Sequence, residues 1–169
     1  MGFLGTGGMT RQEILKSLDK IQSQLQSNQP YGVNFISNMT NSAKEEELAD
    51  ILLERNVTII EASAFMSLTP ALIKYRLTGL TKDIHGNVII RNRIIAKLSR
   101  PEVAEIFLSP APDKIVAKLL QENAITREEA ELSKAIPVAD DITVESDSGG
   151  HTDGGVALTF VHSKPIWLA

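Results

Sequence analysis

The feature that most constrains the fold is a regular alternation of short apolar runs with helical segments. The apolar runs at residues 31–36, 57–62 and 93–99 indicate strands, and the nearly all-apolar run at 57–62 is typical of a strand buried on both faces of a parallel sheet. Strands that alternate with helices predict a parallel sheet with right-handed crossovers. We therefore predict an α/β fold, with a fourth strand at 142–144 and a further strand at 156–161.

Helix start signals lie between these strands. Three capping boxes, in which a Ser or Thr precedes a Glu by three residues, predict helix starts: Thr10 with Glu13, Ser42 with Glu45, and Thr126 with Glu129. The pair Thr69-Pro70 predicts another start, because Pro is well tolerated in the first helical turn. Residues 101–135 are predicted to be helical in two or three pieces, with a break at 109–112. Residues 80–92, which contain His85-Gly86-Asn87, are predicted to form a hairpin.

Composition excludes several classes of function. At 169 residues and 43% hydrophobic, the chain can bury one core. A net charge of −4 with mixed signs argues against nucleic acid or a membrane surface as a partner. The absence of cysteine excludes disulfides, thiolate metal sites and a Cys nucleophile. No apolar run reaches the ~18 residues of a membrane span, and no signal peptide is recognisable, so a cytoplasmic protein is expected.

Residues 140–153 form the most informative segment for chemistry. The strand at 142–144 leads into acidic residues, the adjacent Gly149 and Gly150, and then His151. A loop at the carboxyl end of a strand lies where α/β folds place their active sites. The glycines let the backbone approach a ligand closely, and His151 can then act as a proton donor. The alternative is a plain glycine turn with a solvated histidine.

Two more polar residues occur late in predicted strands. Asn34 follows the apolar start of its strand, and Lys97 lies near the end of the strand at 93–99. A buried lysine needs an anionic partner, although the alternative is a lysine that reaches solvent from the strand end. The Gly5–Gly8 loop lacks a P-loop Lys-Ser/Thr pair, so it is interpreted as a turn. The charged residues expected at the surface are Arg76, Arg91, Arg93, Arg100 and the helix face 128–131.

Seven segments occur here in one order and together resemble a known family. They are residues 31–34, 61–65, 68–70, 96–104, 108–112, 136–141 and 144–153. In this combination the chain closely resembles the flavin-dependent enoyl reductase subunit of polyunsaturated fatty acid and polyketide synthases. That subunit is one of the wider nitronate monooxygenase-like flavoproteins. The resemblance covers about residues 1–153.

The resemblance implies a TIM-type barrel with FMN at the carboxyl ends of its strands. NADPH would reduce the flavin, which would reduce a 2-enoyl thioester carried on an acyl carrier protein. Asn34 and Lys97 match positions that contact FMN in the wider group. Gly149 and Gly150 match the glycine pair that lies against the flavin, and His151 matches the active-site histidine. Other synthase subunits are the expected partners.

The chain also departs from the family pattern. A full barrel needs about 250 residues, whereas this sequence has 169. Family members begin upstream with a first strand and a flavin-contacting loop, and they continue past residue 153 into phosphate-binding loops. The expected organisation is therefore a central barrel portion at 1–153, incomplete at both ends, and a divergent tail at 154–169.

Three alternatives follow from these departures. The first is an enoyl reductase component that is inactive as this chain alone and tends to form homo-oligomers. The second is a non-catalytic remnant or a partner-binding fragment. The third is a nitronate monooxygenase-like oxidase.

Overall fold

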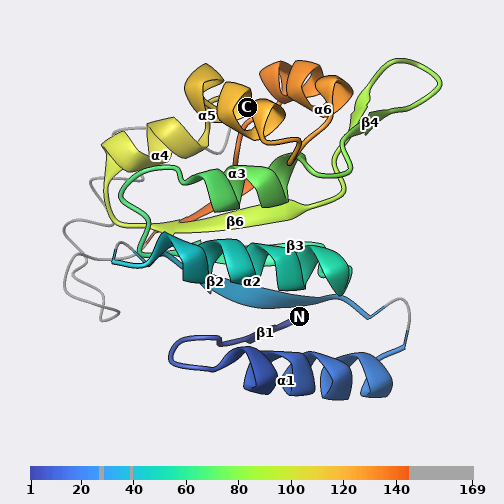
Figure 1. The fold of residues 1–169 in the computed structure, drawn as a ribbon, viewed down its shortest axis with the longest axis vertical. Coiled ribbons are helices and arrows are strands. Elements are labelled where there is room, and N and C mark those ends of the chain that lie inside the picture. The colour runs from blue at the N-terminus through green and yellow to red at the C-terminus, as the bar shows by residue number, and fades with distance from the viewer. Residues whose placement is uncertain (27–28, 39, 145–169) are drawn as a thin grey trace.

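Five parallel strands form the main sheet of the computed structural model, which describes residues 1–26, 29–38 and 40–144 (Figure 1). In order across the sheet they are β1 (Gly2–Leu4), β2 (Tyr31–Ile36), β3 (Ile59–Ser63), β6 (Arg93–Leu98) and β7 (Asp141–Val144). The four strands predicted at 31–36, 57–62, 93–99 and 142–144 are confirmed to within one or two residues. The predicted strand at 156–161 lies outside the described residues. Strand β1 was not predicted, because three residues are too few for an alternating pattern.

Helices follow the strands as the sequence predicted. They are α1 (Arg11–Gln24), α2 (Ser42–Glu54), α3 (Pro70–Leu77), α4 (Pro101–Phe107), α5 (Asp113–Gln121) and α6 (Arg127–Leu132), with a 3₁₀ turn at Ser133–Ala135. The capping boxes at Thr10 and Thr126 are confirmed, since each Thr side chain accepts from the backbone N–H three residues on and the Glu there returns a bond. Across the described ranges, no helix combines the length and the apolar character that a membrane crossing requires.

The strand order decides the type of α/β fold. Successive strands of the main sheet are neighbours and all are parallel. Right-handed crossovers that always advance in one direction keep the connecting helices on the same side of the sheet. Figure 1 shows α1, α2 and α3 following one another along the sheet in this way. This singly wound order is that of β/α barrels and differs from doubly wound sheets, in which the order reverses.

The two faces of the sheet differ in burial. Alternate residues along the central strands are fully buried under the helices and form the core of the sheet: Val33, Phe35, Ile60, Ala62, Ile94, Ala96, Leu98 and Ile142. The residues between them point to the opposite face and are half-buried or exposed. The opposite face is therefore the one on which a ligand can lie.

The predicted hairpin at 80–92 is confirmed. Strands β4 (Thr81–Lys82) and β5 (Val88–Ile89) pair antiparallel, outside the main sheet. The side chain of Asp83 accepts from the backbone N–H groups of His85 and Asn87, both at 2.8 Å. Hydrogen bonds from Asn87 above all hold the pKa of the Asp83 carboxyl below its usual value. The turn at the tip is thus held by its own aspartate.

Arg76 was predicted at the surface, and that prediction is wrong. Its side chain is 1% exposed, and its guanidinium donates to both oxygens of Asp140, at 2.6 and 3.1 Å. It also donates to the backbone oxygens of Asn92 and Pro137. This pair joins α3 to the segments that enter β6 and β7, at the amino ends of the strands. In α/β barrels that end of the sheet serves stability rather than chemistry.

Glu129 was predicted on a solvated helix face, but it is buried. One carboxylate oxygen accepts from the backbone N–H of Thr126 in the capping box. The other accepts from the N–H of Gly79, just past the end of α3, at 2.6 Å. Glu129 therefore ties α6 to the end of α3, whereas Glu128 and Glu131 are exposed as predicted, as are Arg91, Arg93 and Arg100.

Candidate active site at the carboxyl ends of the strands

Polar side chains cross the open face of the sheet near the carboxyl ends of its strands. The register places Asn34 beside Glu61, and it places Ser63 beside Lys97. Residues that are opposite each other in neighbouring parallel strands point to the same face of the sheet. All four side chains are half-buried and lie on the face that the helices leave open. Ile95, in the Asn34 row, adds apolar surface to this face.

Asn34 links several members of this polar cluster. Its Nδ2 donates to Glu61 Oε2 at 3.0 Å and to Ser63 Oγ at 2.9 Å. Its backbone oxygen accepts from the Thr6 hydroxyl at 2.7 Å, which fixes the loop after β1 against β2. The arrangement joins β1, β2 and β3 by side-chain hydrogen bonds in addition to their backbone ladder.

The Gly5–Gly8 loop forms the tight turn that was predicted. Met9 N donates to Thr6 O at 3.1 Å, and Gly8 has a φ of +77°, which favours glycine. A Cβ built on Gly7 would lie 3.1 Å from Ile36 Cδ1, so the loop packs tightly against the end of β2. The loop consequently borders the open face at the carboxyl end of the sheet.

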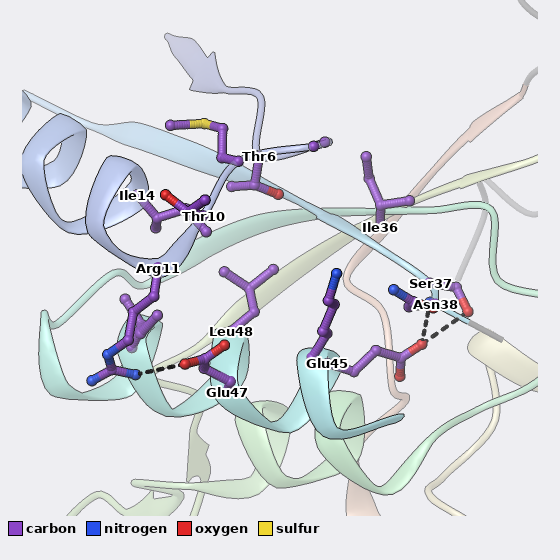
Figure 2. A pocket seen from close by; sticks show the side chains of 15 residues that line it. Thr6, Thr10, Arg11, Ile14, Ile36, Ser37, Asn38, Glu45, Glu47 and Leu48 are labelled. Carbon is purple, nitrogen blue, oxygen red and sulfur yellow. Dashed lines mark hydrogen bonds and ion pairs between the residues drawn. The ribbon is translucent and has the colours of Figure 1, made fainter. Parts of the chain in front are cut away.

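A cavity of about 390 Å³ lies beside this loop (Figure 2). Its walls come from the loops after β1 and β2 and from the first turns of α1 and α2. Ile14, Ile36 and Leu48 give it an apolar part, whereas Arg11 and Glu47 form an ion pair of 3.4 Å at its edge. Its four charged residues are two basic and two acidic (Arg11, Lys44, Glu45 and Glu47), so their formal charges cancel.

Glu45 was predicted to complete a capping box with Ser42, and that prediction is wrong. Helix α2 follows Asn41 as its N-cap, and the Asn41 side chain makes no capping hydrogen bond. The Glu45 carboxylate is 3% exposed and accepts instead from Asn38 N at 2.5 Å and Ser37 Oγ at 3.1 Å, as Figure 2 shows. Glu45 therefore holds the loop after β2, one wall of the cavity.

Two of the five predicted site residues are placed by the structure. Asn34 and Lys97 both lie on the open face, two strands apart. Gly149, Gly150 and His151 lie outside the described residues, as does the whole of the predicted tail at 154–169. The structure adds Glu61 and Ser63, which were not predicted as site residues. Their signal was the pair of polar residues at alternate positions, 61 and 63, of an otherwise apolar strand.

Comparisons with known proteins now identify the kind of protein that this chain resembles. No family model matches the chain. The chain is 54% identical over 161 residues to the polyketide biosynthesis protein PksE of Bacillus subtilis, covering 95% of this chain and 21% of that protein. It is 49% identical over 153 residues to one of the polyunsaturated fatty acid synthase subunits of a Thraustochytrium species, a match that covers 90% of this chain and 10% of that protein.

A solved structure gives the most specific comparison. The crystal structure of the enoyl reductase domain of MlnA, from the macrolactin cluster of Bacillus amyloliquefaciens, superposes with a TM-score of 0.89. That match has 41% identity and covers 97% of this chain and 38% of that chain. The resemblance to the enoyl reductases of these synthases is confirmed. This chain spans about a fifth of the length of PksE and about a tenth of that of the fatty acid synthase subunit.

Proposed function

We propose that this chain forms part of an FMN-dependent enoyl reductase of polyketide or polyunsaturated fatty acid biosynthesis. The substrate would be a 2-enoyl thioester on an acyl carrier protein, with NADPH as reductant and other synthase subunits as partners. The observation that carries the proposal is the polar cluster of Asn34, Glu61, Ser63 and Lys97. It lies on the open face of a singly wound sheet, in a chain 41% identical to an enoyl reductase domain.

The chemistry of this face fits a flavin ring. An isoalloxazine ring offers two apolar faces and, along its edges, both hydrogen-bond acceptors and a donor. The open face supplies apolar surface from Ile36 and Ile95, an amide from Asn34 and an ammonium group from Lys97. Asn34 and Lys97 would hold the ring by hydrogen bonds, and Gly149 and Gly150 would let the chain approach it closely.

The residues of the chain have separate tasks in the proposed reaction. FMN, when bound, supplies hydride transfer from NADPH to the β-carbon of the enoyl group. Hydride addition at that carbon leaves negative charge on the thioester side, which a positioned proton donor must meet. We assign that task to His151. The Thr6 bond to Asn34 O and the Glu45 bonds to the next loop hold the rim of the site in place.

The role proposed for Lys97 predicts a loss of flavin affinity when its charge is removed. The protein for this test is a hybrid reductase, in which this chain replaces the region that it matches in the MlnA enoyl reductase domain. Lys97→Met should weaken FMN binding about 10-fold or more, because a charge-assisted hydrogen bond contributes ~1.5–3 kcal/mol. Flavin fluorescence titration measures this. Lys16→Met, on the exposed side of α1, is the control, and equal affinity in the Lys97 variant and the parent would reject the role.

We further expect the 169-residue protein to have no reductase activity by itself. Within the described residues, β1 and β7 each pair on one side only, so two edges of the sheet are open. Open edges favour association with other chains. Purified protein should therefore oligomerise and should not oxidise NADPH in the presence of a 2-enoyl thioester. Chromatography with light scattering and an absorbance assay at the NADPH band test this expectation, and a monomer with steady turnover would refute it.

A further inference from the structure

We propose that Glu61 and Ser63 are positioning residues that set which atom Asn34 offers to a ligand. They hold the amino group of the Asn34 amide, so its carbonyl oxygen faces the open side and accepts from a ligand N–H. The site would then select a ring that presents an N–H at this point, such as the N–H of a cyclic imide. The inference rests on the proposed function, because FMN is the ligand whose ring would carry this group.

The geometry around Asn34 leaves one orientation of its amide. Nδ2 lies 3.0 Å from Glu61 Oε2, 2.9 Å from Ser63 Oγ and 3.4 Å from the backbone oxygen of Glu61. An ionised carboxylate and a backbone carbonyl only accept hydrogen bonds. A reversed amide would place Asn34 Oδ1 against both of these oxygens with no proton between them. The carboxylate of Glu61 thus decides the orientation, and Ser63 adds a second acceptor.

The other side of the amide is what a ligand meets. Within the described part of the chain, no hydrogen bond uses Asn34 Oδ1, although the side chain is half-buried. A ligand that shields a polar atom from water without forming a hydrogen bond to it loses binding free energy, by about as much as one lost hydrogen bond. The ligand therefore needs a donor at this point. The oxidised isoalloxazine ring has one N–H, at N3, with a carbonyl on each side.

The backbone at Asn34 is fixed as well. The Thr6 hydroxyl donates to Asn34 O at 2.7 Å, and the β2–β3 ladder pairs Asn34 with Glu61. The position of the Asn34 amide is consequently set before a ligand arrives. A group that is held in advance loses less entropy on binding.

The test compares FMN with N3-methyl FMN, which lacks the N–H but keeps both carbonyls. Each compound is titrated into the hybrid reductase that serves for the Lys97 test, and flavin fluorescence gives the two affinities. The parent chain should bind FMN about 10-fold more tightly than N3-methyl FMN, the scale of one hydrogen bond. Glu61→Gln should reduce this ratio below about 3-fold, because glutamine offers an N–H as well as a carbonyl and lets the Asn34 amide reverse.

Glu54→Gln is the matched control, because Glu54 is exposed at the end of α2. The Glu54→Gln variant should still bind FMN about 10-fold more tightly than N3-methyl FMN. Equal affinities of the parent for the two compounds, or a full ratio in Glu61→Gln, would overturn the inference.

A chain that binds neither compound would contradict the FMN proposal itself. The exchange of the Asn34 amide protons with water then decides the positioning role without a ligand. Protection in the parent that is lost in Glu61→Gln supports the role, whereas equal exchange in both overturns it.

Discussion

Replacing Asp140 by alanine is expected to lower the free energy of unfolding by about 3–5 kcal/mol, the usual result of breaking a buried ion pair. Arg76 is 1% exposed, and among the described residues its guanidinium would keep only the backbone oxygens of Asn92 and Pro137 as partners. The backbone N–H of Ile94, which now donates to Asp140 Oδ2 at 2.8 Å, would lose its acceptor as well. Urea unfolding followed by circular dichroism measures the loss.

Two variants make this stability test specific. Asp140→Asn keeps one carbonyl acceptor and should cost less than Asp140→Ala. Glu131→Ala removes an exposed pair with Lys134, whose side chains are 73% and 62% exposed, and should cost less than about 1 kcal/mol. A similar small cost for Asp140→Ala would show that the buried pair does not hold α3 to the sheet.

Removing the imidazole of His151 is expected to lower enoyl reduction by roughly 10²-fold or more while FMN binding is retained. The reason is the proposed role: a positioned proton donor contributes about 10²–10⁴-fold to rate, whereas the flavin is held by other residues. The hybrid reductase with His151→Ala should keep the yellow flavin spectrum. The rate of NADPH oxidation with a carrier-bound 2-enoyl thioester measures the loss.

His85→Ala is the control for this variant, because His85 lies exposed on the hairpin and should leave turnover unchanged. Unchanged turnover in His151→Ala would exclude His151 as the proton donor. Loss of both flavin and turnover would assign it to cofactor binding instead.

The sequence was sufficient for the α/β class and for four of the five strands of the main sheet. Strong local signals carried those predictions, namely apolar β-branched runs and the capping boxes at Thr10 and Thr126. The box at Ser42 failed because Glu45 has better partners in the loop after β2. Such competition between a local and a tertiary hydrogen bond cannot be read from spacing alone.

The buried ion pair of Arg76 and Asp140 is a second case in which a tertiary contact could not be predicted from the local sequence. Arg76 and Asp140 are 64 positions apart in the sequence. A single arginine on a short helix gives no sign of a partner at that separation, so it was assigned to the surface. The burial of Arg76 can be predicted only once β6 and β7 are known to be neighbours in the sheet.

The candidate site was predicted in part for a related reason. Asn34 and Lys97 could be found because each is a polar residue late in an apolar strand. Glu61 and Ser63 became site residues only through the register between β2 and β3, which sets them beside Asn34. Residues 149–151 carry a sequence motif that the described structure does not reach, so their roles stay predictions.

The central claim is that this chain supplies part of an FMN-dependent enoyl reductase site. Its most direct test is NADPH oxidation by the hybrid reductase with a carrier-bound 2-enoyl thioester, run beside the unmodified MlnA enoyl reductase domain. We predict bound FMN and a rate within about 10-fold of the unmodified domain, since the two chains share one fold, with a TM-score of 0.89 and 41% identity. A folded hybrid that binds no flavin and reduces no enoyl thioester would contradict the claim and would favour a partner-binding role for this chain.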